Sequence, residues 1–207
     1  NVSLNLQALG ATPLLFSVTG DDEKGRRFRK LMEKNNLAAS GIFVDPQRIT
    51  TVKSRIICNG QHIARIDEES TEYIDSALEM MIFNAIHRTI ESRKIDVIIF
   101  VDYDKGMITP TLFEKVHALA REKKIFVAVD PKRRNFHLYH EVDLFKPNFK
   151  EFVEGTGRPI RKGDLEILKK TAEEYKKEKS FKLIFITLSE LGVFISNGVS
   201  QTYYPAE

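Results

Sequence analysis

Polar side chains of ligand-binding type follow four apolar segments in the second half of the chain, each directly after its segment ends. In chain order they are Asp102 and Lys105, then Lys132, then Asn148 and Glu151, then Thr187, Ser189 and Gly192. Lysines and carboxylates bind phosphates and their counter-ions, while short hydroxyl and glycine turns offer hydrogen bonds to anions. The sequence offers no activated nucleophile. This favours binding and positioning chemistry, as in phosphoryl transfer.

Each of these residues also has a structural interpretation. Asn148 and Glu151 fit an Asn-x-x-Glu capping box, which satisfies helix-end amides without a ligand. Asp102 is equally suited to closing a turn after a strand, and Thr187 and Ser189 are equally suited to being turn hydroxyls. Lys105 and Lys132 are harder to explain structurally, because each stands in a short polar loop directly after a strand. A phosphate or substrate role is favoured for at least one of these lysines.

The elements that must position these residues alternate between strand and helix. Residues 97–101, 125–129, 144–145 and 183–186 are short apolar runs typical of buried strands, and helical patterns separate them. This order predicts an α/β fold, an open and mostly parallel sheet with helices on both faces. Ligands bind such sheets at the carboxyl ends of the strands, where the strand order switches. A final antiparallel hairpin is predicted over 193–203.

In the first half of the chain, the pattern of polar and apolar residues changes between residues 42 and 66. Helices are predicted at about 22–35 and 76–91, but the stretch between them alternates polar and apolar residues around an Asn59-Gly60 turn signal. This pattern predicts a small antiparallel flap of two or three strands with one face that needs cover. With no repeat or linker present, 1–207 is interpreted as a single domain with 42–66 as a β lid.

Composition excludes several classes of protein. The net charge is only +3, and basic residues alternate with acidic ones, so no nucleic-acid partner is predicted. Cys58 is the only cysteine, which favours a reducing compartment and a small core role for that side chain. No apolar run reaches the roughly 20 residues of a membrane helix, so we expect a soluble, cytoplasmic protein without a membrane partner.

Several motifs that would point elsewhere are missing. The sequence contains no Gly-x-x-x-x-Gly-Lys-Ser/Thr loop, no Gly-x-Gly-x-x-Gly between strand and helix, and no Gly-x-Ser-x-Gly. A dinucleotide-binding oxidoreductase is therefore disfavoured. His137 and His140 are close in sequence, but no neighbouring acid or thiol cluster suits a metal cage. Structural or exposed roles are expected for the histidines.

The motifs, taken in order, resemble the ribokinase-like (PfkB-type) carbohydrate kinases. Within that family they are most similar to the D-glycero-β-D-manno-heptose 7-phosphate kinase domain of bifunctional ADP-heptose synthesis proteins. The matching segments are NVSLNLQALGA, VTGDDEKG, RIICNGQHIARIDEE, VDYDKGMITP, VDPKRRNFHLYHEVDLFKPNFKEF and FITLSELGVF. The fold implied is the ribokinase-like one, with a small antiparallel β lid. The resemblance spans nearly the whole sequence, and its strength lies in the order and spacing of the motifs.

The resemblance implies roles for matching positions. Nucleotide binding would fall to Asn148, Glu151, Thr187, Ser189 and Gly192, with Glu151 meeting Mg²⁺ through a metal-bound water. Sugar-phosphate binding would fall to Asn1, Arg65, Asp102, Lys105 and Lys132. ATP and Mg²⁺ are the implied cofactors, a small-molecule sugar phosphate is the implied substrate, and a homodimer through the β lid is the implied assembly.

The resemblance also implies what lies outside the sequence. The chain starts at Asn1 in mid-helix and ends after a strand, so we interpret it as incomplete at both ends. The family's Gly-Ala-Gly-Asp loop, with the catalytic aspartate, is expected after Glu207, and no residue present is assigned that role. The expected activity is conversion of heptose 7-phosphate to the 1,7-bisphosphate, for ADP-heptose and lipopolysaccharide core precursors. The alternatives are a PfkB-type kinase for another sugar or nucleoside, and a non-catalytic relative that binds nucleotide or sugar phosphate.

Overall fold

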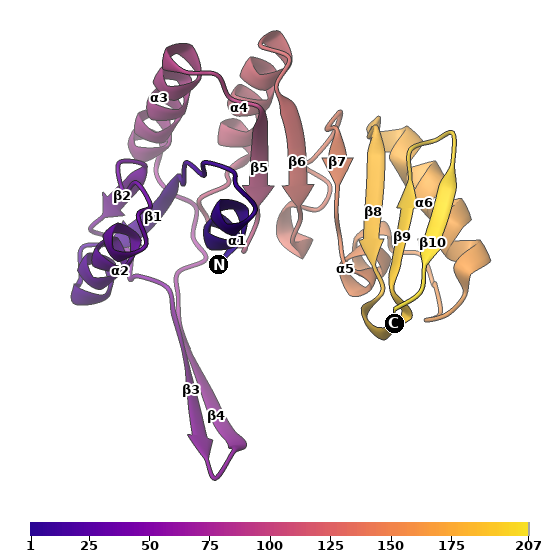
Figure 1. The fold of residues 1–207 in the computed structure, drawn as a ribbon, viewed down its shortest axis with the longest axis horizontal. Helices are drawn as coiled ribbons and strands as arrows, with labels where there is room; N and C mark the ends of the chain where they lie inside the picture. The colour runs from indigo at the N-terminus through magenta and orange to yellow at the C-terminus, as the bar shows by residue number, and fades with distance from the viewer. Residues whose placement is uncertain (207) are drawn as a thin grey trace. The chain divides into compact units, whose positions relative to one another are not determined.

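The computed structural model describes residues 1–206, which form two compact units (Figure 1). Unit 1 contains Asn1–Glu91 and Lys105–Thr109, and unit 2 contains Ser92–Asp104 together with the chain from Pro110 onward. The predicted polar loop after residue 101 is therefore divided, with Asp102 in unit 2 and Lys105 in unit 1. A single kinase domain over 1–207 would require the two units to act together, and it stays a prediction.

Unit 1 holds three helices and four strands among its described residues. Its elements are α1 (Val2–Ala8), β1 (Ser17–Gly20), α2 (Glu23–Lys34), β2 (Ile42–Asp45), β3 (Val52–Cys58), β4 (Gln61–Glu68) and α3 (Ser76–Ser92). The α2 helix begins where the sequence predicts, because the Asp22 carboxylate accepts a hydrogen bond from the Gly25 amide, 2.7 Å away. The predicted flap region divides, since β2 pairs in parallel with β1 and only β3 and β4 form the antiparallel hairpin.

The β3–β4 hairpin has one apolar and one charged face. Ser54 pairs with Ile66 and Ile56 with Ala64, so these four side chains share a face. The alternate pairs, Lys53 with Asp67 and Arg55 with Arg65, place charged groups on the opposite face. Ile56 and Ile66 are 48% and 51% exposed, so the apolar face is open to solvent in this chain.

Unit 2 is built on a six-stranded sheet (Figure 1). Its elements are β5 (Val97–Val101), α4 (Pro110–Glu122), β6 (Phe126–Asp130), the 3-10 turn η1 (Arg133–Asn135), β7 (Leu144–Phe145), α5 (Phe149–Thr156), α6 (Leu165–Lys179), β8 (Leu183–Thr187), the 3-10 turn η2 (Ser189–Leu191), β9 (Val193–Ser196) and β10 (Gln201–Tyr204). The strands β5 to β8 are parallel, and β9 and β10 continue the sheet as the predicted antiparallel hairpin.

The strand order of this sheet places the polar loops side by side. Neighbouring strands follow the chain order from β5 to β10, so the four parallel strands deliver their carboxyl ends to one edge in sequence. The sequence predicts a site at a reversal of strand order, but no reversal occurs within this sheet. The polar residues gather instead along a continuous rim. The last parallel strand, β8, meets the antiparallel β9 at one end of that rim.

The core of unit 2 is aromatic. Phe136, Tyr139, Phe145 and Phe152 are fully buried, and Phe145 stacks on Phe181 with ring centroids 4.4 Å apart. These rings bury a large apolar area and fix the loops between the strands.

The apolar run of β5 predicts a strand covered on both faces, but the structure buries only one of them. Phe100 packs edge-on against Phe113 of α4, whereas Val97 and Ile99 are 46% and 39% exposed on the other face. The apolar run therefore predicted the strand correctly, but its prediction that both faces are buried was wrong.

Candidate functional site

Direct contacts link the carboxyl ends of neighbouring strands in unit 2. The Asp102 amide donates to the Asp130 carbonyl, 3.0 Å away, which joins the ends of β5 and β6. The Thr187 amide donates to the Pro147 carbonyl at 3.2 Å, and Asn148 lies opposite Thr187 in a parallel bridge. The four residues predicted to share one rim, Asp102, Lys132, Asn148 and Thr187, are therefore placed along it. Their ligands stay predictions.

Asn148 and Glu151 form the predicted capping box at the start of α5. The Asn148 side chain accepts from the Glu151 amide, and the Glu151 carboxylate accepts from the Asn148 amide, both at 2.9 Å. The second oxygen of Glu151 is bound by the Lys132 ammonium group. The capping box therefore also holds a lysine from the preceding loop at the helix N-terminus, and the ligand roles of Asn148 and Glu151 stay predictions.

Lys132 stays charged in this environment. Its partial burial by itself would lower the pKa of the ammonium group, but the hydrogen bond to Glu151 and the negative charges of Asp130 and Asp102 raise the pKa above the ordinary lysine value. The side chain is 37% exposed, so part of it faces solvent. A second lysine, Lys146, lies 3.3 Å from Asp130. The rim therefore presents two cations in front of a row of acids.

Both carboxylate oxygens of Asp102 accept hydrogen bonds from the protein. The residue is 3% exposed. One carboxylate oxygen accepts from the Asp104 amide at 2.7 Å. The other accepts from the Asn135 side chain at 3.0 Å and the Tyr139 hydroxyl at 2.9 Å. These three bonds make Asp102 a positioning group for its loop, and direct substrate contact by this residue stays a prediction.

A wide groove opens beside α5 and the β8–β9 turn. Its volume is about 840 Å³, within the range of small-molecule sites. Four of the five residues predicted to bind nucleotide line it: Asn148, Thr187, Ser189 and Gly192. The lining also includes two lysines that the sequence motifs did not indicate, Lys150 and Lys162. Lys162 could have been suspected only from its place beside the Gly163-Asp164 helix start.

Backbone conformation explains the composition of the β8–β9 turn. Ser189 adopts a left-handed conformation with φ of 57°, and the Leu188 amide donates to the Gly192 carbonyl at 2.8 Å. Gly192 has φ of 94°, and a β-carbon there would lie 1.9 Å from the Tyr204 carbonyl oxygen. Only glycine lets β10 and the turn approach this closely, and that approach forms one wall of the groove.

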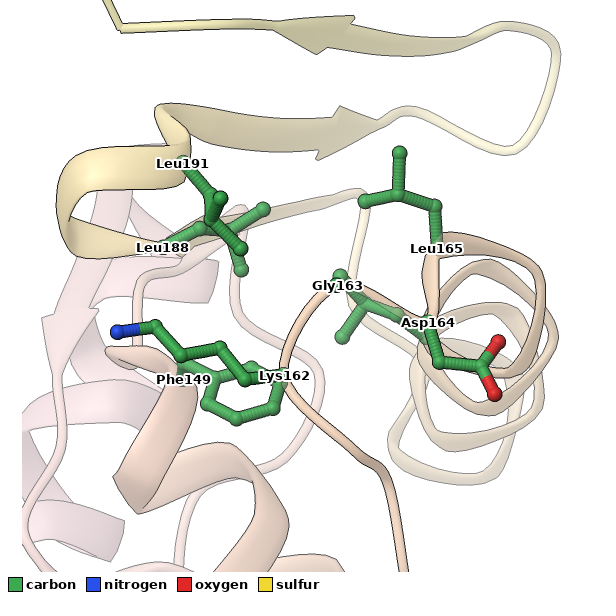
Figure 2. Close-up of a pocket in the computed structure, with 8 residues that line it drawn as sticks. Phe149, Lys162, Gly163, Asp164, Leu165, Leu188 and Leu191 are labelled. Atoms are coloured by element: carbon green, nitrogen blue, oxygen red, sulfur yellow. The ribbon is translucent and has the colours of Figure 1, made fainter.

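A small apolar cavity adjoins this groove and shares Phe149, Lys162 and Leu188 with it (Figure 2). Leu165, Leu168 and Leu191 complete its apolar wall. The Asp164 carboxylate points away from the cavity in Figure 2 and instead caps α6, where it accepts from the Ile167 amide at 3.1 Å. Lys162 lies 2.5 Å from Glu190, and this contact lowers the pKa of Glu190 to about 2, so the carboxylate is charged near neutral pH.

The sugar-side residues Arg65 and Lys105 belong to unit 1, where a chain of ion pairs joins them. Arg65 contacts Asp67 at 3.0 Å, and Lys53 bridges Asp67 and Glu69 at 3.0 and 2.9 Å. Lys105 then contacts the other oxygen of Glu69 at 2.8 Å. Lys105 and Lys53 lower the pKa of Glu69. The charged face of the hairpin therefore continues to the loop that carries Lys105.

Arg48 fixes the position of that loop and was missed by the sequence motifs. Its guanidinium donates to the carbonyls of Lys105 and Glu72, both at 2.9 Å, and contacts Asp45 at 3.1 Å. Gly106 is required beside it, because it has φ of 74° and a β-carbon would lie 1.7 Å from the Glu72 carbonyl oxygen.

Asn1, the remaining sugar-side prediction, is exposed in unit 1. It occupies the N-cap position of α1, and its side chain makes no capping hydrogen bond. Its role in sugar binding stays a prediction.

Comparison with known proteins identifies the relatives of this chain. The family model described as pfkB family carbohydrate kinase matches residues 1–207. The bifunctional protein HldE of Geobacter metallireducens is 37% identical over 200 residues, which are 96% of this chain and 40% of that protein. The protein of the same name from Sulfurimonas denitrificans is 35% identical over 195 residues, 94% of this chain and 40% of that protein. The chain thus spans about two fifths of the length of these relatives.

Solved structures share the fold. Phosphofructokinase-2 from Escherichia coli, in complex with potassium, aligns with a TM-score of 0.75 at 13% identity, covering 99% of this chain and 64% of that one. A putative sugar kinase from Clostridium perfringens aligns with a TM-score of 0.69 at 20% identity, covering 98% of this chain and 61% of that one.

Among residues 1–206, no helix is both long and apolar enough to cross a membrane.

Proposed function

Because the chain belongs to the pfkB family of carbohydrate kinases, we propose that the whole protein uses ATP to phosphorylate heptose 7-phosphate at its anomeric hydroxyl. The product would be heptose 1,7-bisphosphate, a precursor of ADP-heptose for the lipopolysaccharide core. Two findings support this choice of sugar: the motif resemblance described above, and relatives of 35–37% identity named bifunctional protein HldE. We place the reaction in the cytoplasm, where ATP is supplied.

The observation that carries the proposal is the rim of unit 2. Four neighbouring strands end in polar groups, and the rim continues into a groove of about 840 Å³ that two lysines line. Phosphoryl transfer needs little covalent chemistry from the protein, because its rate depends on positioning and on the neutralisation of phosphate charge. Cations and helix-start amides around a groove are suited to that task.

We assign the triphosphate to the groove beside α5. Asn148, Thr187, Ser189 and Gly192 would supply hydrogen bonds to its oxygens, and Lys162 would contribute positive charge. The neighbouring apolar cavity, with Phe149 and Leu188 in its wall, offers a surface for apolar parts of the nucleotide. The general base is not assigned to any described residue.

Mg²⁺ would be held near Glu151 through water. Both carboxylate oxygens already accept one hydrogen bond, from the Asn148 amide and from Lys132, and each retains a second lone pair. The adjacent ammonium group disfavours direct coordination, whereas Mg²⁺ normally keeps several waters that can reach the free lone pairs. When bound, the ion would neutralise phosphate charge, and Glu151 would orient its water shell.

The sugar phosphate is assigned to the charged groups that include Lys105 and Arg65. Both residues have a carboxylate partner in this structure, so a phosphate bound there would share or replace Glu69 and Asp67 as the counter-ion. Lys132, Asp102 and Asn1 complete this assignment, with Asp102 acting mainly to hold its loop.

The β3–β4 hairpin is assigned the role of a lid that also joins two copies of the chain. Its exposed apolar face would be costly to leave in water, and a second copy of the same face is a matching cover. A homodimer through this lid is therefore part of the proposal.

The activity is tested with the whole protein, ATP, Mg²⁺ and heptose 7-phosphate. We expect stoichiometric ADP formation and a new anomeric phosphate resonance in ³¹P NMR. A parallel series replaces the heptose with fructose 6-phosphate, ribose, fructose and adenosine. Turnover of one of these and not of heptose 7-phosphate would assign a different sugar or nucleoside. Binding of ATP without turnover of any acceptor would instead support a non-catalytic relative.

A further inference from the structure

Two histidines and a glutamate come together on unit 2. Glu114, His117 and His140 each direct one ligand-type atom into a common space, and these three atoms all lie within 4.8 Å of one another. His140 and Glu114 are already in contact, with 3.0 Å between Nε2 and Oε1. The kinase assignment above uses none of these residues.

The fold brings the three residues together from two separate elements. Glu114 and His117 stand three residues apart on α4, so both lie on the same face of the helix. His140 comes from the loop between η1 and β7, 23 residues further along the chain. His137, which is nearer in sequence to His140, lies elsewhere, with its Nδ1 atom 3.5 Å from the Tyr175 hydroxyl.

The surroundings of His117 hold its ring in a defined orientation. The ring stacks on Phe113 with centroids 5.1 Å apart and an angle of 10°, and it meets the ring of His140 at 90°. Its Nε2 atom lies 3.3 Å from the Glu141 carbonyl oxygen. Histidines that bind metals typically donate their second N–H to such a carbonyl, which fixes the tautomer.

The charge environment favours a neutral imidazole at this position. His117 is 3% exposed. Burial, followed by the nearby His140 and Arg121, lowers the pKa of His117, while Glu114 and Asp143 act in the opposite direction. Metals bind the neutral form of histidine. Arg121 is itself held by Glu141 in an ion pair, so its charge is partly compensated.

We propose that Glu114, His117 and His140 bind a divalent transition metal ion of the Zn²⁺ class. Two imidazoles and one carboxylate are a known ligand set for zinc, with a water in the fourth position. Ligand atoms around a tetrahedral zinc lie about 3.4 Å apart, so the cluster needs only a small side-chain adjustment from its present spacing. The hard, oxygen-preferring Mg²⁺ of the kinase reaction would not select this set.

The consequence of metal binding is a cross-link between α4 and the loop before β7. That loop carries Tyr139, directly before His140, and the Tyr139 hydroxyl holds Asp102 in the rim. A bound ion would therefore stiffen a segment that positions part of the candidate active site. The inference does not depend on which sugar the protein phosphorylates.

The test is Zn²⁺ binding by the whole protein, measured by competition with a chromophoric chelator. The variants are His140→Ala and Glu114→Gln, because both side chains reach the surface and their loss leaves the buried His117 in place. His137→Ala is the matched control, since it removes a nearby histidine outside the cluster. We expect one Zn²⁺ site that is weakened roughly tenfold or more in both variants and is unchanged in the control. Each protein is checked by circular dichroism before titration.

Two further measurements separate a metal site from a simple His140–Glu114 ion pair. Zn²⁺ should raise the melting temperature of the wild type and of His137→Ala, but not that of His140→Ala. Co²⁺ should give visible absorption bands of low-symmetry coordination that His140→Ala abolishes. The proposal is overturned if no saturable Zn²⁺ binding occurs at micromolar protein, or if His140→Ala binds the ion as tightly as the wild type.

Discussion

At the scale of single residues, Lys132 connects the loop after β6 to the start of α5. It is the cation bound to Glu151 at the start of α5, and the charges of Asp130 and Asp102 favour its ionised form. Its side chain is part-exposed, and its role as a phosphate ligand stays a prediction. One carboxylate thus serves two contacts, because Glu151 binds Lys132 through Oε1 and accepts from the Asn148 amide of the capping box through Oε2.

Replacement of Lys132 by alanine tests this double role. We expect kcat/KM of the whole protein to fall by about 10- to 100-fold, because a charge-assisted contact to the sugar phosphate is lost. The free energy of unfolding should fall by only about 1 kcal/mol, since the ion pair is partly solvated. Steady-state kinetics and urea denaturation measure the two effects. The matched control is Lys177→Ala, an exposed lysine on α6. Kinetics within twofold of wild type would remove Lys132 from the site.

At the scale of elements, Asp22 joins the start of α2 to the segment before β3. One carboxylate oxygen caps the helix through the Gly25 amide at 2.7 Å, and the other accepts from the Thr50 amide at 2.8 Å. The Thr50 hydroxyl in turn accepts from the Gly20 amide at 2.9 Å. This small network fixes β1, α2 and the root of the hairpin to one another within unit 1.

The stability contributed by Asp22 should depend on pH. Hydrogen bonds from Thr50 and then Gly25 lower the pKa of Asp22 from 3.8 to about 2. The folded form therefore binds the proton less readily than the unfolded form. The contribution is present above about pH 4 and is lost as the pH falls toward 2.

Asp22→Ala should lower the free energy of unfolding of unit 1 by about 1–2 kcal/mol at pH 7. The difference from wild type should shrink between pH 5 and pH 2. Asp21→Ala, which removes an exposed carboxylate one residue earlier, should cost less than about 0.5 kcal/mol. Urea denaturation followed by far-UV circular dichroism at several pH values measures both variants. An Asp22→Ala effect of the same size at pH 3 and pH 7 would contradict this account of the cap.

At the scale of the whole molecule, the β3–β4 hairpin is the element through which we propose that two copies of the chain associate. On its charged face, Arg65 forms an ion pair with Asp67 and Lys53 forms one with Glu69. Its apolar face exposes Ile56 and Ile66. A two-stranded ribbon is marginally stable by itself, and cover on its apolar face would stabilise it. Assembly and substrate binding would then use opposite faces of the same hairpin.

The double variant Ile56→Lys/Ile66→Lys should weaken self-association of the whole protein by at least about tenfold, because it places like charges at the proposed interface. Sedimentation velocity over a range of concentrations should show a dimer for wild type and a monomer for the variant. Ile167→Lys is the control, since Ile167 is also about half exposed (45%) but lies on α6. A monomeric wild type, or a double variant that remains dimeric, would rule out the apolar hairpin face as the interface.

The sequence by itself determined the elements and the family. Short apolar runs predicted β5 to β8, the Asn148–Glu151 spacing predicted the capping box, and Asn59-Gly60 predicted the hairpin turn. These features depend on residues close in the chain, where backbone preference and hydrogen bonding act locally. The order of the motifs then indicated the carbohydrate kinase family, which the family match confirms.

Only the tertiary structure decided which side chains meet. Lys132 reaches Glu151, ion pairs link Arg65 to Lys105, and His140 joins His117 and not its sequence neighbour His137. It also decided that β2 pairs with β1 and that one face of β5 stays exposed. The physical reason is that side-chain contacts between distant segments depend on strand order and on how the core packs. The spacing of residues along the chain specifies neither the strand order nor the packing of the core.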